Sequence, residues 1–464
     1  MKKKHVLFKA VMAMFILLFF VPVFAGDYTQ EIFVPGEVIA LADSEEEAQL
    51  IADMYGLELL SCFEGVAVFG SPNPRASISN SNLMRSRMRN ANLPVLSLNT
   101  IYTTSFGEMP VETSAASNND TLRNWQHSAM DTYRAWDITQ GAGVVVAVID
   151  TGIYTDLVAF LMQNFPKAYN SFTNKTGRSN VNDDYGHGSH VSSIIADWRE
   201  GVAPHVTIMP IKANTPNYGT FQTASVLRGI NYAVENGAHI INLSLGREFS
   251  RGENAVERAV IANAVARGVI VFAAAGNESD DNVGYPAAYP EVIAVTALRW
   301  ENGEAVFDDS YSNYGPQADL SAPGTDIFGP DYWGGGLIPL SGTSMASPNA
   351  AGVAALIKAR NPSFTPQQIR ERMTSTARHA GTVGKDLKYG YGMVNAYAAL
   401  LGTGGLHKVT YHSSATKSDT VRVVPGGKLV MPDAVFEDGL LITGWRVAAA
   451  KDFCVILRQI FFRY

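Results

Sequence analysis

Three short signatures carry side chains that could act together on a carbonyl group. Asp150 follows an apolar, mostly β-branched run, His187 stands between two glycines, and Ser344 opens a segment of small residues. A serine hydroxyl is a weak nucleophile until an adjacent base takes its proton, and a histidine oriented by a carboxylate is such a base. The residue types therefore suit nucleophilic catalysis.

Each signature also has an ordinary structural explanation. Asp150 could cap the turn after its strand, His187 could be a packed core residue, and Ser344 could be a simple helix N-cap. The positions of Asp150 and Ser344 favour a catalytic role over a structural one. Ligands bind at the carboxyl ends of parallel strands, where Asp150 lies, and a helix N-terminus such as that at Ser344 can stabilise an oxyanion. The glycines beside His187 would let backbone approach closely. His190, one turn further on, is expected to be a packed structural histidine.

The chain from Gly143 alternates between short apolar runs and helix-length periodic segments, which predicts a parallel sheet with right-handed crossovers. Thr365 begins a further helix with a capping box and a proline at its first position, and this helix closes an α/β domain near residue 401. Strands are expected over 144–149, 207–211, 239–245, 269–274 and 292–296, and helices over 223–235 and 254–266.

The flanking segments differ in composition. Residues 31–70 predict a small α+β unit, with strands over 37–41 and 65–69 and a helix that Ser44 caps. Residues 77–92 and 105–121 are rich in Ser, Asn and other polar residues, so they are expected to be exposed connectors, with a domain boundary near residue 120. Residues 406–446 predict short strands with glycine turns, similar to a β repeat of bacterial surface proteins, whereas 447–464 continue no recognised pattern.

The N-terminus indicates export. Lysines at positions 2–4 precede an apolar run over 10–25 that ends in small residues, as in a secretory signal peptide. Apolar residues make up 47% of the chain and charged residues 17%, which indicates a compact globular protein. The net charge of −7, without basic and aromatic clusters, argues against nucleic acid as a partner. Cys62 and Cys454 are too few for a disulfide framework.

Taken together, the motifs Asp150-Thr-Gly, Gly186-His187-Gly and Gly342-Thr-Ser344-Met-Ala-Ser-Pro resemble those of the subtilisin-like serine proteases, in the same chain order. The resemblance covers about residues 125–401. Further matching motifs occupy 201–204, 241–246, 273–277, 321–324 and 390–395.

The resemblance implies an α/β, subtilisin-like three-layer fold with a mainly parallel central sheet, a small α+β propeptide and a short β-rich tail. It makes Ser344 the nucleophile, His187 the general base and Asp150 the residue that orients the histidine. It assigns the oxyanion to the side chain of Asn277 and the backbone N–H of Ser344. The resemblance also gives the substrate cleft two walls, formed by Ser244, Leu245 and Gly246 and by Ala274, Ala275 and Gly276.

The expected organisation is a signal peptide over 1–25, a propeptide with linker over 26–120, a peptidase domain over 121–401 and an incomplete β-repeat-like tail over 402–464. The resemblance implies that the propeptide inhibits the enzyme until it is cut off. The cut is expected within 105–121, because proteases favour exposed polar segments.

Two departures from the family pattern concern a residue that supports the catalytic triad and a loop that binds metal. Asn349 stands where the family has histidine. The segment 190–201 lacks the inserted loop that carries calcium in many relatives. Asp156 is expected to face solvent, and the acid pairs Asp183-Asp184 and Asp280-Asp281 are typical of solvated loops. The chemistry needs no cofactor, while the metal site is unknown and calcium is undecided.

The predicted function is a secreted serine endopeptidase that acts on proteins or peptides, without a membrane span after processing. One alternative is an α/β-hydrolase esterase using Ser344, Asp386 and His407, but the sequence around Ser344 lacks the second glycine of a nucleophile elbow. A second alternative is a cell-surface binding protein on an inactive protease scaffold, which the tail repeat suggests.

Overall fold

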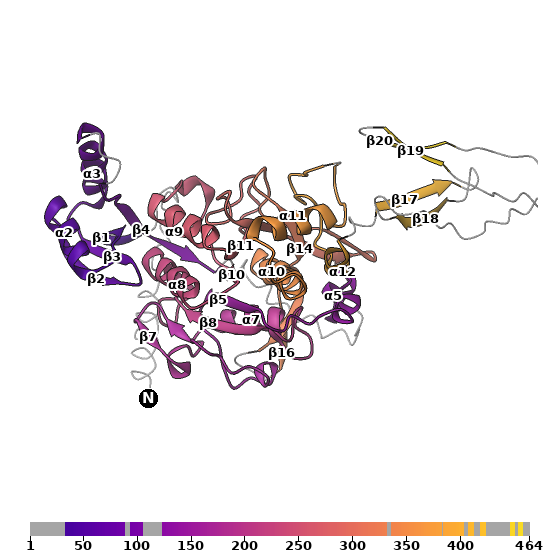
Figure 1. Ribbon diagram of the computed structural model, residues 1–464, viewed down its shortest axis with the longest axis horizontal. Helices are drawn as coiled ribbons and strands as arrows, with labels where there is room; N and C mark the ends of the chain where they lie inside the picture. The colour runs from indigo at the N-terminus through magenta and orange to yellow at the C-terminus, as the bar shows by residue number, and fades with distance from the viewer. Residues whose placement is uncertain are drawn as a thin grey trace, which may run out of the picture. The chain divides into compact units, whose positions relative to one another are not determined.

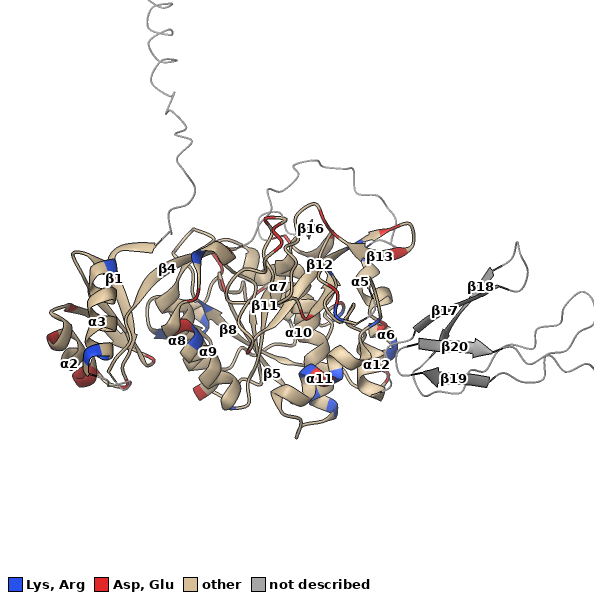
Figure 2. Ribbon diagram, turned by 90° about the horizontal axis from the view of Figure 1, so that it is seen from above, with Lys and Arg blue, Asp and Glu red and all other residues tan. Residues whose placement is uncertain are grey.

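The computed structural model describes residues 33–88, 93–104, 123–331, 336–382 and 384–402, and the backbone of four strands beyond them (Figure 1). The predicted signal peptide lies outside these residues. Among the described segments, no helix is both long and apolar enough to cross a membrane. Figure 2 shows Lys, Arg, Asp and Glu mainly on peripheral helices and loops, in line with the low charged fraction.

A nine-stranded sheet forms the centre of the larger part of the chain. Its spatial order is β13 (Glu304–Phe307), β12 (Ile293–Glu301), β11 (Ile270–Ala274), β10 (Ile240–Leu243), β5 (Val145–Asp150), β8 (Thr207–Lys212), β6 (Tyr169–Asn170) and β7 (Lys175–Thr176), with β14 (Leu320–Pro323) also paired to β12. All pairs between β12 and β6 are parallel, and only β13 and β7 run antiparallel to their neighbours. The predicted mainly parallel sheet is therefore confirmed.

Helices cover both faces of this sheet, because its strands are apolar on both sides. Along β5, Val146 and Val148 belong to one core cluster with α7 (His187–Ala196) and α10 (Thr343–Arg360). Ala147 and Ile149 belong to the other, with α8 (Thr223–Glu235) and α9 (Ala255–Ala266). The alternation of side chains along one strand thus produces three layers (Figure 1).

Shorter elements complete this part of the chain. They are α5 (Trp125–Ala129), α6 (Thr132–Trp136), α11 (Pro366–Thr376), α12 (Ala396–Leu401), the hairpin of β15 (Ile327–Pro330) and β16 (Leu337–Leu340), and 3-10 turns at Val158–Phe160, Arg178–Asn180 and Phe249–Arg251. The expected capping box of α11 is present, since Thr365 accepts from the Gln368 N–H and the Gln368 side chain accepts from the Thr365 N–H.

The N-terminal sheet is antiparallel and takes its last strand from the larger part of the chain. Its order is β2 (Glu58–Phe63), β3 (Val66–Gly70), β1 (Phe33–Leu41), β4 (Ser97–Thr103) and β9 (Thr220–Gln222). One face packs on α2 (Glu45–Tyr55), which Ser44 caps as expected. On the other face, Ile39, Val68 and Tyr102 join the core cluster that contains α8.

The expectation of a connector over 77–92 was wrong, because a helix, α3 (Pro74–Met88), occupies most of it. Asn73 caps this helix by accepting from the Ala76 N–H at 3.1 Å, and Pro74 fits the first helical position. Only Pro74 and Ser81 are buried along it. With so little apolar periodicity, the composition resembled that of a loop.

Two hairpins follow Leu401. They are β17 (His407–His412) with β18 (Ser418–Val423), and β19 (Arg446–Ala450) with β20 (Phe453–Leu457). The first agrees with the expected short strands. The second lies where no pattern was recognised.

Candidate active site

Asp150 and His187 meet at the carboxyl end of β5. Asp150 is the last residue of that strand, and its Oδ1 lies 2.7 Å from His187 Nδ1. The same oxygen accepts from the Thr151 N–H at 2.7 Å. Both side chains are fully buried. The carboxylate therefore holds one ring nitrogen of His187 and determines how the imidazole is oriented.

Glycines bring the first turn of α7 onto this strand end. Gly186 has φ +96°, a conformation that suits glycine, and places His187 as the first residue of the helix. A Cβ on Gly188 would lie only 2.2 Å from the carbonyl oxygen of Gly152. The close backbone approach expected from the sequence is present.

Asp183 is a buried organiser of this region, so its assignment to a solvated loop was wrong. Its Oδ1 accepts from Thr151 Oγ1 at 2.8 Å and from the Gly186 N–H at 2.8 Å, and its Oδ2 accepts from the Ser189 N–H at 2.9 Å and Oγ at 2.7 Å. It joins the loop after β5 to the start of α7. Its neighbour Asp184 forms a 2.7 Å ion pair with Lys212.

We expect Asp183→Asn to lower the free energy of unfolding by about 2 to 4 kcal/mol. An amide has only one acceptor oxygen, so its NH2 group would face donors that are buried and cannot turn to water. The measurement is urea unfolding of Ser344→Ala protein, which prevents self-digestion. The control is Asp281→Asn, at an exposed acid whose carboxylate accepts from the Asn282 side chain. A cost at position 183 no larger than at 281 would contradict the organising role.

Ser344 is the second residue of α10 and is joined to the end of β10. Its Oγ donates to the Ser244 carbonyl at 3.2 Å, and Ser244 Oγ donates back to the Ser344 carbonyl at 2.8 Å. Asn242 Nδ2 donates to Ser244 Oγ at 2.9 Å, and Ser347 Oγ donates to Asn242 Oδ1 at 2.7 Å. Sequence reasoning did not assign these roles to Asn242 and Ser347, since the two residues are far apart in the chain.

Asn277 is positioned by Thr343, the residue before Ser344. Its Oδ1 accepts from the Thr343 N–H at 2.9 Å and from Thr343 Oγ1 at 2.8 Å. The donor end of the amide, Nδ2, is therefore turned away from Thr343. Gly276, at φ +111°, also donates its N–H to Thr343 Oγ1 at 3.1 Å. Thr343 lies in the recognised motif, but its role was not predicted.

The two expected cleft walls follow neighbouring parallel strands. Ser244, Leu245 and Gly246 come after β10, and Ala274, Ala275 and Gly276 lie at the end of β11. Gly246 exchanges two backbone hydrogen bonds with Thr103 of β4, each 3.1 Å long. The next residue, Thr104, donates its N–H to the Gly219 carbonyl at 2.7 Å. The end of β4 thus runs as an added strand between Gly219 and Gly246.

Other predicted residues have supporting contacts. His190 is fully buried, and burial lowers its pKa to about 3, so it is a neutral core residue as expected. Asn349 is also buried and donates to the carbonyls of Pro323 and Met345. Asp386 accepts from N–H groups of its own loop, including that of Lys388 at 2.7 Å, which gives no support to its role in an esterase triad. The side chain of His407 lies outside the described residues.

Asp156 is exposed, as expected, and pairs with Arg178 at 2.7 Å. This contact does not fit a cation ligand. Within the part of the chain that the structure describes, no group of three or more His, Cys, Asp or Glu could hold a metal ion.

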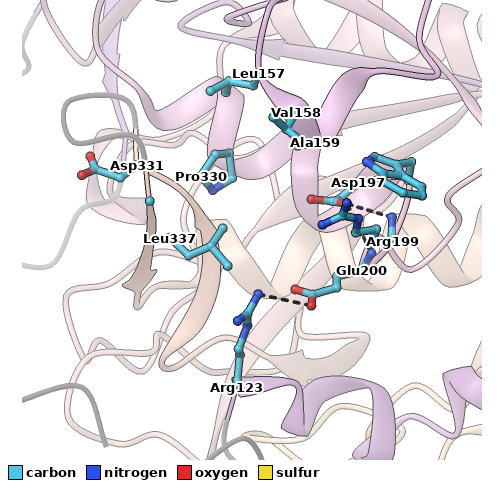
Figure 3. Close-up of a pocket in the computed structure, with 12 residues that line it drawn as sticks. Arg123, Leu157, Val158, Ala159, Asp197, Arg199, Glu200, Pro330, Asp331 and Leu337 are labelled. Atoms are coloured by element: carbon cyan, nitrogen blue, oxygen red, sulfur yellow. Dashed lines mark hydrogen bonds and ion pairs between the residues drawn. The ribbon is translucent and has the colours of Figure 1, made fainter. Parts of the chain in front are cut away.

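Figure 3 shows a separate pocket, which Leu157 and Leu337 help to line together with Arg123 and Glu200, two residues that form a 3.3 Å ion pair. None of the predicted site residues lines it.

Comparison with known proteins identifies the family of the chain. A model of the subtilase family matches residues 141–392. A thermostable alkaline protease of Halalkalibacterium halodurans is 40% identical over 263 residues, covering 55% of this chain and 67% of that protein. Subtilisin DY of Bacillus licheniformis is 37% identical over 273 residues, covering 56% of this chain and 92% of that protein. The fold is similar to that of fervidolysin from Fervidobacterium pennivorans, with a TM-score of 0.66 and 22% identity over 85% of this chain and 68% of the other.

Proposed function

Because the chain belongs to the subtilase family of serine proteases, we propose that it is a secreted endopeptidase that cuts protein substrates with Asp150, His187 and Ser344. The observation that carries the proposal is the buried 2.7 Å contact between His187 Nδ1 and Asp150 Oδ1. It supports a histidine whose other nitrogen, Nε2, serves as the base.

In the proposed reaction, the Ser344 hydroxyl turns from the Ser244 carbonyl toward His187, gives its proton to Nε2 and attacks the substrate carbonyl carbon. The Ser344 N–H and Asn277 Nδ2 stabilise the oxyanion. His187 then protonates the leaving amine, and water hydrolyses the acyl-enzyme by the same steps in reverse order. Each step uses the chain's own groups, so the scheme calls for no cofactor.

The test is incubation of the exported protein with a peptide library, followed by mass spectrometry of the products and of its own new N-terminus. The endopeptidase proposal expects internal cuts and a processed chain. The alternative of a surface-binding protein on an inactive scaffold expects neither.

The N-terminal unit is proposed to act as an inhibitor until it is cut off. Its strand β4 pairs with Gly246, in the segment predicted to bind substrate. A substrate would need the same backbone groups. Competition for them supports inhibition by occupancy of the cleft.

We expect the first self-cleavage after Ser105. Thr103 pairs antiparallel with Gly246. In an antiparallel pair, two residues forward on one strand match two residues back on the other, so a chain that continues in this register places residue 105 opposite Ser244. Ser244 is the residue whose carbonyl accepts the Ser344 hydroxyl. The carbonyl presented to the nucleophile is then that of residue 105, and early samples should show a new N-terminus at Phe106.

Insertion of two glycines after Glu108 provides the control, because it leaves the distance from Thr103 to the cut unchanged. The first cut should stay after residue 105 in this variant. A first cut that moves with the insertion would contradict the register argument.

A further inference from the structure

A buried carboxylate binds the hydroxyl of Tyr102, a side chain of β4. Tyr102, the residue before Thr103, is fully buried. Its hydroxyl donates to Glu257 Oε1 at 2.6 Å. Glu257 lies in the first turn of α9 and is 1% exposed. The larger part of the chain thus supplies a buried carboxylate that binds a phenol.

Glu257 keeps its orientation independently of Tyr102. Its other oxygen, Oε2, accepts from Arg247 at 2.7 Å and lies 2.8 Å from the hydroxyl of Tyr289. The Asn254 N–H donates to that same hydroxyl at 3.0 Å. All of these partners lie after residue 123 and would stay with the peptidase when the N-terminal unit leaves. Only Oε1 would then lose its donor.

Aromatic rings and a cation lie around this carboxylate. The Arg247 guanidinium lies 4.9 Å from the ring centre of Tyr285 and 5.8 Å from that of Tyr102. Burial raises the pKa of Tyr102 well above its usual value, and the adjacent Glu257 carboxylate raises it further, so the phenol remains a donor. A phenylalanine in the same place would leave Oε1 buried without its hydrogen bond.

We propose that Glu257 is a specificity-determining residue, an inference that rests on the proposed endopeptidase function. It selects tyrosine over phenylalanine at the substrate position that lies three residues before the residue whose peptide carbonyl is attacked. The register assigns the position, because Tyr102 precedes Ser105 by three residues. A site built to bind a hydroxyl discriminates strongly against an analogue that lacks it, since its own polar group is left unpaired.

The experiment uses the enzyme that forms when the full-length chain processes itself, and three fluorogenic peptides with the sequence of residues 99–110. They carry tyrosine, phenylalanine or O-methyltyrosine at the position of Tyr102. We expect kcat/KM for the tyrosine peptide to exceed that for the other two by about tenfold to a hundredfold, the range for a hydrogen bond to a charged group. Phenylalanine removes the hydroxyl without adding bulk, so the ratio of tyrosine to phenylalanine measures the hydrogen bond. O-methyltyrosine cannot donate and also places a methyl group against Oε1, so it tests how closely the site fits the hydroxyl.

Variants then assign the preference to Glu257. Glu257→Gln should reduce the ratio of tyrosine to phenylalanine severalfold, and the pair Arg247→Leu with Glu257→Leu should reverse it in favour of phenylalanine. Glu253→Gln, at an exposed acid in the preceding loop, should leave the ratio unchanged.

Equal rates for the three peptides with the unmodified enzyme would overturn the role of Glu257 while leaving the endopeptidase intact. Cleavage of none of them, in protein that also cuts no library peptide, would overturn the proposed function, and this inference with it. The peptide series needs no variant to fold.

Discussion

Ser344→Ala should give a chain that stays full length and loses proteolytic activity by on the order of 10⁶-fold, the size of the effect of removing the nucleophile in subtilisin. Without the hydroxyl no acyl-enzyme forms, so neither self-cleavage nor hydrolysis of added peptides can follow this route. Intact mass spectrometry, peptide hydrolysis and labelling by a fluorophosphonate probe measure the three consequences.

Ser341→Ala is the matched control for this variant. It removes a hydroxyl three residues earlier that accepts from the backbone N–H of Asp326 at 3.0 Å. This variant should mature and take up the label. An alanine at position 344 that still produces a normal new N-terminus on its own would refute the nucleophile assignment. Processed wild-type protein that never takes up label would favour the binding alternative.

Asp150→Asn should reduce kcat/KM by about 10⁴-fold while leaving the fold intact. The carboxylate only accepts, so it keeps the proton of neutral His187 on Nδ1. An asparagine amide can donate to Nδ1 instead, which moves the imidazole proton to Nε2, the nitrogen that must accept from Ser344. The measurements are peptide hydrolysis and the nitrogen chemical shifts of His187, which report the tautomer directly.

The control for this substitution is Asp156→Asn, at an exposed acid whose ion pair with Arg178 contributes at most about 1 kcal/mol. It should keep full activity. Loss of activity at position 150 together with loss of structure would point to a stabilising role. An unchanged tautomer with full activity would remove Asp150 from the mechanism.

Local signals predicted much of the fold. The cap at Ser44, the capping box at Thr365 and the β-branched run before Asp150 all act within a few residues, and each appears in the structure. The subtilisin-like α/β fold and the serine endopeptidase class are confirmed by the family match. Helix α3 escaped prediction because its stability depends on a cap and a proline instead of an apolar face.

The features that sequence reasoning missed depend on contacts between distant segments. Asp183 resembles any loop acid until Thr151 and Ser189 fold onto it. Glu257 occupies an ordinary first-turn position of a helix, and its partner Tyr102 is 155 residues away. The roles of the predicted site residues remain predictions that the variants above test.

Strand β9 has a further consequence for the behaviour of the enzyme at high concentration. Departure of β4 would leave β9 as an open sheet edge with unpaired backbone groups, and such edges can recruit other chains into aggregates. However, β9 spans only Thr220–Gln222, and α8 begins at the next residue. So short an edge can still form backbone hydrogen bonds with a peptide that pairs with Gly246 on its other side. It offers the edge strand of another folded molecule few backbone N–H and C=O groups. If substrates bind as proposed, the short β9 would allow substrate binding without promoting self-association.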